Sequence, residues 1–194
     1  MKIKLLTLIA VFSLLTSAAL AAEPASSSDL DKADKLFAAG KYQEALVLYR
    51  KTLSSPPVNL TAGDISSKIG DTFFRLADYR GALDAYRLAI RDQRHVDRAQ
   101  TQYWIGFCCF LLGRDAEAVE EFLKISALYP DAKAWGSTSY YWAGRASERM
   151  GKKEQAAAYY RKAGGNGKST QSRFARKKAE ALKTSTKTQA SNPK

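Results

Sequence analysis

Four regularly spaced alanines constrain the fold of this chain more than any other feature. Each alanine is followed four residues later by an aromatic residue, and the intervals between successive alanines are 37, 36 and 38 residues. A period of this size is typical of stacked helical repeats, in which each repeat is one supersecondary unit. The four pairs are Ala45 with Tyr49, Ala82 with Tyr86, Ala118 with Phe122 and Ala156 with Tyr160.

Between residues 29 and 163 the apolar positions recur every three or four residues, which predicts helices and no strands. We expect four helix–turn–helix repeats. The first helices are predicted at 28–39, 64–76, 96–112 and 134–150, and the second helices at 42–53, 79–91, 116–128 and 154–163. Gly40, Gly113 and Gly151 follow the first helix, where a left-handed C-cap is needed. The second repeat has Ala77 there, which predicts a strained or differently closed turn.

A second set of residues recurs with the same period. The first helices contain Ile69-Gly70-x-x-Phe73, Ile105-Gly106-x-x-Cys109 and Ala143-Gly144-x-x-Ser147. Together with the alanine–aromatic pairs, these strings make the chain resemble a tetratricopeptide repeat (TPR) protein over about residues 29–183. The resemblance implies an all-α fold, a right-handed TPR superhelix or α-solenoid of about four repeats with a C-terminal capping helix. The glycines and alanines would let paired helices approach closely, and the aromatic residues would fill the gaps between repeats.

A narrower resemblance is carried by the Tyr-Trp-x-Gly strings at 103–106 and 141–144. These strings are similar to those of periplasmic TPR proteins of Gram-negative envelopes. The types concerned are the Tol–Pal-associated cell-division coordinator and the TPR lipoproteins of outer-membrane barrel assembly. This chain has neither the coiled coil of the first nor the lipidated cysteine of the second. The resemblance therefore favours the compartment and the repeat module.

The N-terminal residues predict export from the cytoplasm. Residues 1–21 have a basic start, an apolar run and the small-x-small pattern Ala19-Leu20-Ala21, as in a cleavable signal peptide. Residues 22–28 are expected to form a flexible leader. The sequence contains no cysteine for lipidation after the apolar run and no further apolar stretch of membrane-spanning length. We therefore expect an exported, soluble periplasmic protein.

The net charge of +12 is concentrated at the C-terminal end. Residues 165–194 carry eight lysines and arginines and one acidic residue, Glu180. We expect 164–183 to form a basic capping helix that covers the last repeat, and 184–194 to be a disordered tail. In an exported protein the basic end favours an anionic surface over nucleic acid as a partner, although a merely solvated surface remains the alternative.

No arrangement of residues in the sequence indicates catalysis, so we expect no enzyme activity, no cofactor and no metal site. His95 is the only histidine, and no metal-binding cluster has zinc spacing. Cys108 and Cys109 are adjacent within a predicted helix, where a disulfide between them would be strained. We interpret both as small apolar core residues.

The resemblance to TPR arrays implies that the first helices line a concave face that binds ligands. There the sequence offers an aromatic trough with arginines on one wall, which suits a peptide with apolar anchors and a carboxylate. We therefore predict a periplasmic scaffold or adaptor that binds a peptide segment of an envelope protein. The alternatives are that the aromatic residues are core, or that the apolar third repeat makes the protein a self-assembling envelope module or homodimer. The predicted groove residues are Asp71, Phe74, Arg75, Tyr103, Phe107, Phe110, Tyr141, Arg145 and Arg149.

Overall fold

The structure is a computed structural model and describes residues 27–165, 167 and 169–190. Within these residues every regular element is a helix, and each helix boundary in the four repeats lies within two residues of its predicted position. The helices are α1 (Ser27–Ala38), α2 (Tyr42–Ser54), α3 (Ala62–Arg75), α4 (Tyr79–Arg91), α5 (Arg98–Leu111), α6 (Asp115–Leu128), α7 (Lys133–Arg149), α8 (Lys153–Gly164) and α9 (Thr170–Ala190).

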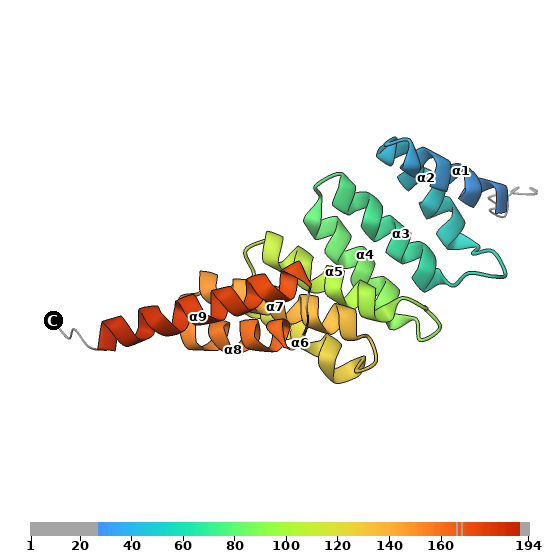
Figure 1. The fold of residues 1–194 in the computed structure, drawn as a ribbon. Helices are drawn as coiled ribbons and strands as arrows, with labels where there is room; N and C mark the ends of the chain where they lie inside the picture. Colours follow the sequence, from blue (N-terminus) through green and yellow to red (C-terminus); the bar gives the residue numbers. More distant parts are fainter. Residues whose placement is uncertain (1–26, 166, 168, 191–194) are drawn as a thin grey trace, which may run out of the picture.

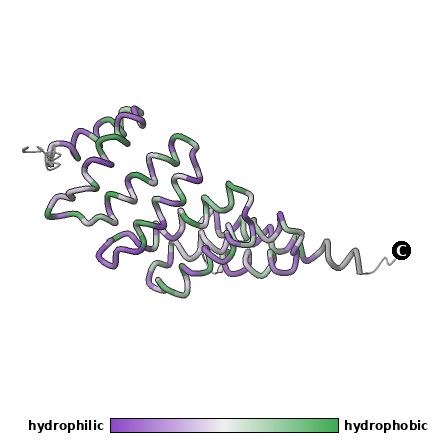
Figure 2. Tube along the Cα trace, turned by 180° about the vertical axis from the view of Figure 1, so that it is seen from behind, coloured by the Kyte–Doolittle hydropathy of each residue, from purple (hydrophilic) through white to green (hydrophobic). Residues whose placement is uncertain are grey.

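Consecutive helices pack against one another along the whole row, from α1 against α2 to α8 against α9 (Figure 1). Hydrophobic and hydrophilic residues alternate along the helices throughout the row, as expected for helices that each bury one face (Figure 2). The predicted all-α solenoid is therefore confirmed. The last two residues of the predicted leader belong to α1, and the rest of it, with the predicted signal peptide, lies outside the described residues.

In three repeats an aromatic ring of the second helix lies directly against a glycine of the first. A Cβ atom added to Gly70 would be 2.6 Å from the ring of Tyr86. The corresponding distances are 2.8 Å at Gly106 and at Gly144, to the rings of Phe122 and Tyr160. Any side chain at these glycines would displace a fully buried ring. The repeated glycines are therefore required by packing, as the sequence pattern predicts.

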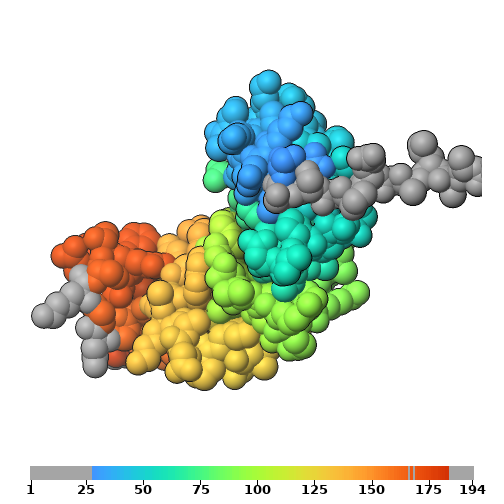
Figure 3. Space-filling model, turned by 90° about the vertical axis from the view of Figure 1, so that its right-hand side faces the viewer, coloured from blue at the N-terminus to red at the C-terminus, as the bar shows by residue number. Residues whose placement is uncertain are grey.

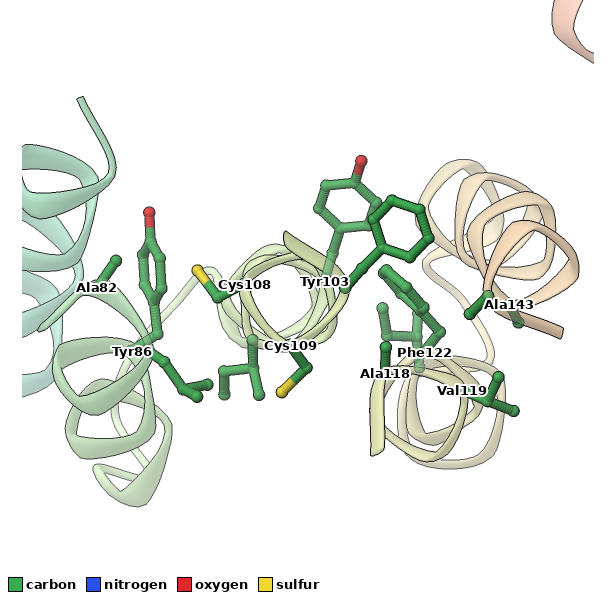
Figure 4. Packing of buried hydrophobic residues seen from close by; sticks show 14 residues of the cluster. Ala82, Tyr86, Tyr103, Cys108, Cys109, Ala118, Val119, Phe122 and Ala143 are labelled. Atoms are coloured by element: carbon green, nitrogen blue, oxygen red, sulfur yellow. The ribbon is translucent and has the colours of Figure 1, made fainter. Parts of the chain in front are cut away.

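Helix α5 is the centre of the largest core cluster. In Figure 4, Cys108 points from α5 toward Tyr86 of the preceding helix pair, while Tyr103 lies on the other side, near Phe122. Both cysteines are free and completely buried, and burial raises the pKa of each thiol to about 12. They remain protonated at neutral pH, so the prediction that they are small core residues is confirmed.

Helix α9 covers the last repeat, as predicted for a capping helix. The Ser169 hydroxyl accepts a hydrogen bond from the Ser172 N–H, and Ala175 and Ala179 are buried against α8. Helix α9 continues to Ala190 and so extends into the segment 184–194, which is expected to be a disordered tail. Residues 184–190 contain neither glycine nor proline, and extending an existing helix is easier than nucleating one. Within the described residues, no helix has both the length and the apolar composition to cross a bilayer.

The turn of the second repeat is strained, as its sequence predicts. Ala77 has a φ angle of +59°, close to the values between +74° and +76° of Gly40, Gly113 and Gly151 in the other three turns. All four repeats thus close the turn in the same left-handed conformation. An alanine in this region costs about 1–2 kcal/mol, whereas glycine adopts it freely.

Replacing the strained alanine should stabilise the protein. We expect Ala77→Gly to raise the free energy of unfolding by about 0.5–1 kcal/mol, since relief of the left-handed strain exceeds the added flexibility of the unfolded chain. Urea unfolding followed by circular dichroism measures the change.

The matched control is Gly113→Ala in the third repeat. No atom lies within 4 Å of a Cβ built there, so the substitution tests the backbone alone. It should lower stability by about 1 kcal/mol. Equal stability of Ala77→Gly and the wild type, alongside a destabilised Gly113→Ala, would show that the Ala77 turn is not strained.

Candidate functional site

Three adjoining hollows lie along the first helices of the N-terminal three repeats. Their volumes are about 340, 210 and 270 Å³, and Asp71 of α3 lines all three. We call this surface the α1–α3–α5 groove. In Figure 3 the row of repeats bends, and the outline is hollowed between its N-terminal and C-terminal ends. The remaining residues that line the groove on these helices are Asp34, Phe37, Asp64, Ser67, Lys68, Phe74, Arg75, Gln100 and Trp104.

Aromatic side chains form the walls of the groove. Phe37 lies between the two smaller hollows, and Trp104 lies between the two larger ones. The rings of Phe74 and Trp104 are 4.9 Å apart, and the ring of Phe107 continues the row at 6.0 Å from Phe74. These partly buried rings provide flat apolar surfaces that can accept the side chains of a ligand.

The floor of the groove is built by tyrosines that reach across from the second helices. Tyr49 donates a hydrogen bond to Asp34 at 2.5 Å, and Tyr86 donates one to Asp71 at 2.6 Å. Burial and the adjacent carboxylate raise the pKa of both hydroxyls, so they remain donors at any physiological pH. Each tyrosine thus fixes one oxygen of a carboxylate that faces the groove.

The fourth repeat has a related pair and the third repeat has none. Tyr160 donates a hydrogen bond to Glu148 at 2.7 Å. In the third repeat the tyrosine is replaced by Phe122, and the position equivalent to Asp71, one residue after the glycine, is Phe107. The third repeat thus lacks both the tyrosine hydroxyl and the carboxylate that would accept its hydrogen bond. At this position of the first helix, α3 therefore carries a carboxylate and α5 carries a phenyl ring.

His95 lines the largest of these three hollows. Its Nδ1 lies 2.7 Å from Oδ1 of Asp64, and its Nε2 lies 2.7 Å from the hydroxyl of Thr101. The order of these groups is that of a catalytic triad. However, Thr101 is only 1% exposed, so its hydroxyl cannot reach a substrate. The three residues instead tie α3 to α5.

Asp64 also caps its own helix. Its backbone N–H donates to the Thr61 hydroxyl, and its carboxylate accepts the Thr61 N–H at 2.8 Å, which is a complete capping box. Burial would raise the pKa of Asp64, but the hydrogen bonds from His95 and Thr61 outweigh that effect and hold the pKa below its usual value.

Of the nine predicted groove residues, Asp71, Phe74 and Arg75 line the groove. Three others belong to the core: Tyr103 and Phe110 are 8% exposed, and Tyr141 is 9% exposed. The alternative that the aromatic residues of α5 are core is therefore correct for Tyr103 and Phe110. Phe107 is half-buried between Phe74, which lines the groove, and Trp142, so it lies at the border between the groove and the core.

The predicted wall of arginines needs correction. Arg149 Nε donates to Asp115 at 2.7 Å, and its Nη2 donates to the carbonyl of Phe110 at 2.5 Å. Its guanidinium thus joins the third and fourth repeats and already has a carboxylate partner within the chain. Arg145 lies over the ring of Trp142, 5.8 Å from its centroid.

Several residues that line the groove are not among those predicted from the sequence, notably Phe37, Lys68, Gln100 and Trp104. Lys68 and Trp104 each stand two residues before the repeat glycine and three residues before a predicted groove residue, Asp71 and Phe107, so the helical period places them on the same face. The Tyr-Trp-x-Gly string contains the signal for Trp104, because its tryptophan occupies the same place relative to the glycine as Lys68 does one repeat earlier.

The ionised form of Asp64 should contribute to stability above pH 4. Because its pKa is lowered by folding, this contribution is fully present above the usual value near 4 and is lost as the pH falls through the lower folded-state pKa. We expect Asp64→Ala to lower the free energy of unfolding at pH 7 by about 2 kcal/mol, because His95 loses a charged hydrogen-bond partner.

The measurement is urea unfolding of the wild type and Asp64→Ala between about pH 2.5 and 7. The difference between them should shrink below about pH 4. Asp31→Ala, which removes an exposed acid of α1, serves as the control and should behave as the wild type. A difference that does not depend on pH would show that ionisation of Asp64 does not stabilise the fold.

Comparison with known proteins identifies the repeats. Residues 67–133 and 137–163 each match a family model described as a tetratricopeptide repeat. Comparison with curated proteins gives no match.

Solved structures of other repeat proteins share the fold. The chain is similar to MamA (21% identity, TM-score 0.59, covering 70% of this chain and 69% of that one). It is similar to YrrB, described as a TPR protein with an unusual peptide-binding site (20% identity, TM-score 0.58, covering 70% of this chain and 66% of that one). It is also similar to the apo form of RapI (13% identity, TM-score 0.68, covering 83% of this chain and 64% of that one). The chain spans about two thirds of these neighbours, and such identities show the fold alone. The matched segments and the solenoid together establish that this chain contains tetratricopeptide repeats.

Proposed function

We propose that the protein is a non-catalytic scaffold that binds a peptide segment of a partner protein in the α1–α3–α5 groove. The observation that carries this proposal is the groove itself, in which aromatic walls from three repeats surround the carboxylate of Asp71. Apolar surfaces with a few fixed polar groups are what an extended or helical peptide needs for affinity and orientation. The unusual peptide-binding site described for YrrB is consistent with this use of the fold.

The proposed place of action is the periplasm, with a protein of the cell envelope as partner. This part of the proposal is supported by the signal-like residues 1–21 and by the resemblance to periplasmic TPR proteins. The basic C-terminal end is proposed to contact an anionic surface, since Arg173 and Lys177 of α9 are exposed.

Self-assembly through the third repeat is the alternative function, and the structure gives it less support. Eight residues of α5 are buried within a single chain, so the helix has little apolar surface left for a second copy. Among the described residues, the exposed large apolar side chains are distributed over several helices and loops. Light scattering at high protein concentration should therefore report a monomer, and a stable dimer would favour self-assembly.

In-cell crosslinking tests the groove. A photoreactive residue at Gln100, which lines two of the hollows, should capture one specific partner. The control position is Glu120, which is exposed on α6, a second helix outside the groove. Mass spectrometry identifies the captured proteins. Capture of the same proteins from both positions, or of none from Gln100, would contradict binding in the groove.

A further inference from the structure

We propose that the groove recognises a lysine or arginine side chain of the bound peptide, whose cationic group pairs with Asp71 beside Trp104. This inference rests on the proposed function and adds the chemistry of the ligand to it. The equivalent carboxylate one repeat earlier is that of Asp34, and it is paired with Lys68 of the protein itself. Asp71 has no ion pair of this kind among the described residues.

Asp34 of the first repeat has two partners. Its carboxylate accepts the hydrogen bond from Tyr49 and also binds the ammonium group of Lys68, at 2.9 Å. Lys68 comes from the next repeat, and its Nζ lies 5.8 Å from the centre of the Tyr49 ring. Glu148 in the fourth repeat is similar, with the hydroxyl of Tyr160 and the ammonium of Lys178 at 3.0 Å.

Asp71 has the tyrosine and lacks the lysine. Lys68 stands two residues before Gly70, and the position two residues before the next repeat glycine is Trp104. The residue that should bring the ammonium group is thus an aromatic wall of the groove. In the described part of the chain, Asp71 has Tyr86 as its one hydrogen-bond donor and takes part in no ion pair.

The charged groups around Asp71 leave a place for a cation. Lys68 is paired with Asp34, and Arg75 is exposed at the end of α3 without an ion pair among the described residues. Asp64 and Asp97 line the adjoining hollow, so the groove has more acidic than basic side chains although the chain has a net charge of +12. Burial raises the pKa of Asp71, despite the hydrogen bond from Tyr86 and the charges of Lys68 and Arg75, as expected for a carboxylate that lacks a close cation.

The aromatic residues suit the rest of a basic side chain. The rings of Tyr86 and Trp104 are nearly parallel, 14° apart in orientation and 6.5 Å between centroids. Trp104 can cover the methylene stem of a lysine or arginine and attract its cationic group through the ring face. An apolar neighbour in the peptide would then reach the hollow between Phe37 and Phe74.

The test is selection of a phage-displayed random 12-residue peptide library on the immobilised full-length protein and on two variants. Asp71→Asn removes the charge and keeps an acceptor for Tyr86, so it should fold, which circular dichroism checks. Asp84→Asn removes the same charge from the exposed surface of α4 and is the matched control. Selected peptides are then titrated by fluorescence anisotropy.

We expect peptides enriched in lysine or arginine next to an apolar residue. Their affinity should fall by about tenfold or more with Asp71→Asn, stay within about twofold with Asp84→Asn, and decrease with added salt. A third variant, Trp104→Ala, is used in the titrations only. Selected peptides that contain no basic residue and lose affinity with Trp104→Ala would overturn this inference and leave the groove in place. Failure to enrich any peptide would overturn the proposed function, and the inference with it.

Discussion

In three of the four repeats the architecture depends on the contact between a glycine of the first helix and an aromatic ring of the following helix. At Gly70, Gly106 and Gly144 an added Cβ would come within 2.6–2.8 Å of a ring carbon. This close approach sets the spacing within the repeat and explains why a chain of amphipathic helices forms a solenoid. One pair of helices alone cannot bury its apolar face, so the repeats must stack on one another to form a stable core.

The same contact creates the candidate site. A tyrosine ring that lies flat against a glycine spans the first helix and brings its hydroxyl to the concave face. There it donates a hydrogen bond to a carboxylate of the first helix, as Tyr86 does to Asp71 and Tyr160 does to Glu148. Where the ring is Phe122, no hydroxyl arrives and the concave position is apolar. A tyrosine in the second helix thus accompanies a carboxylate on the first helix, and Phe122 accompanies the apolar Phe107.

The period, the helices and the capping helix can be predicted from sequence because each depends on local pattern: apolar spacing, left-handed turns and a polar final helix. The strain at Ala77 can be predicted in the same way, because the other three repeats have glycine at this position of the turn. The site is harder to predict. The helical spacing places Tyr103, Phe110 and Tyr141 in the groove, but they are buried because neighbouring helices cover both sides of α5 and α7. Arg149 is expected to be free, but it is paired with Asp115 of the preceding repeat. Contacts between repeats of this kind are not visible in the spacing of one helix.

The most direct test of the groove uses the tryptophans as reporters. A peptide from the library selection is titrated into the ¹⁵N-labelled protein, and the indole N–H signals are followed by NMR. Trp104 lines two of the hollows, whereas Trp135 packs against Tyr103 outside them. Binding in the α1–α3–α5 groove predicts a large shift of the Trp104 signal and little change for Trp135. A bound peptide that leaves Trp104 unshifted would contradict binding in this groove.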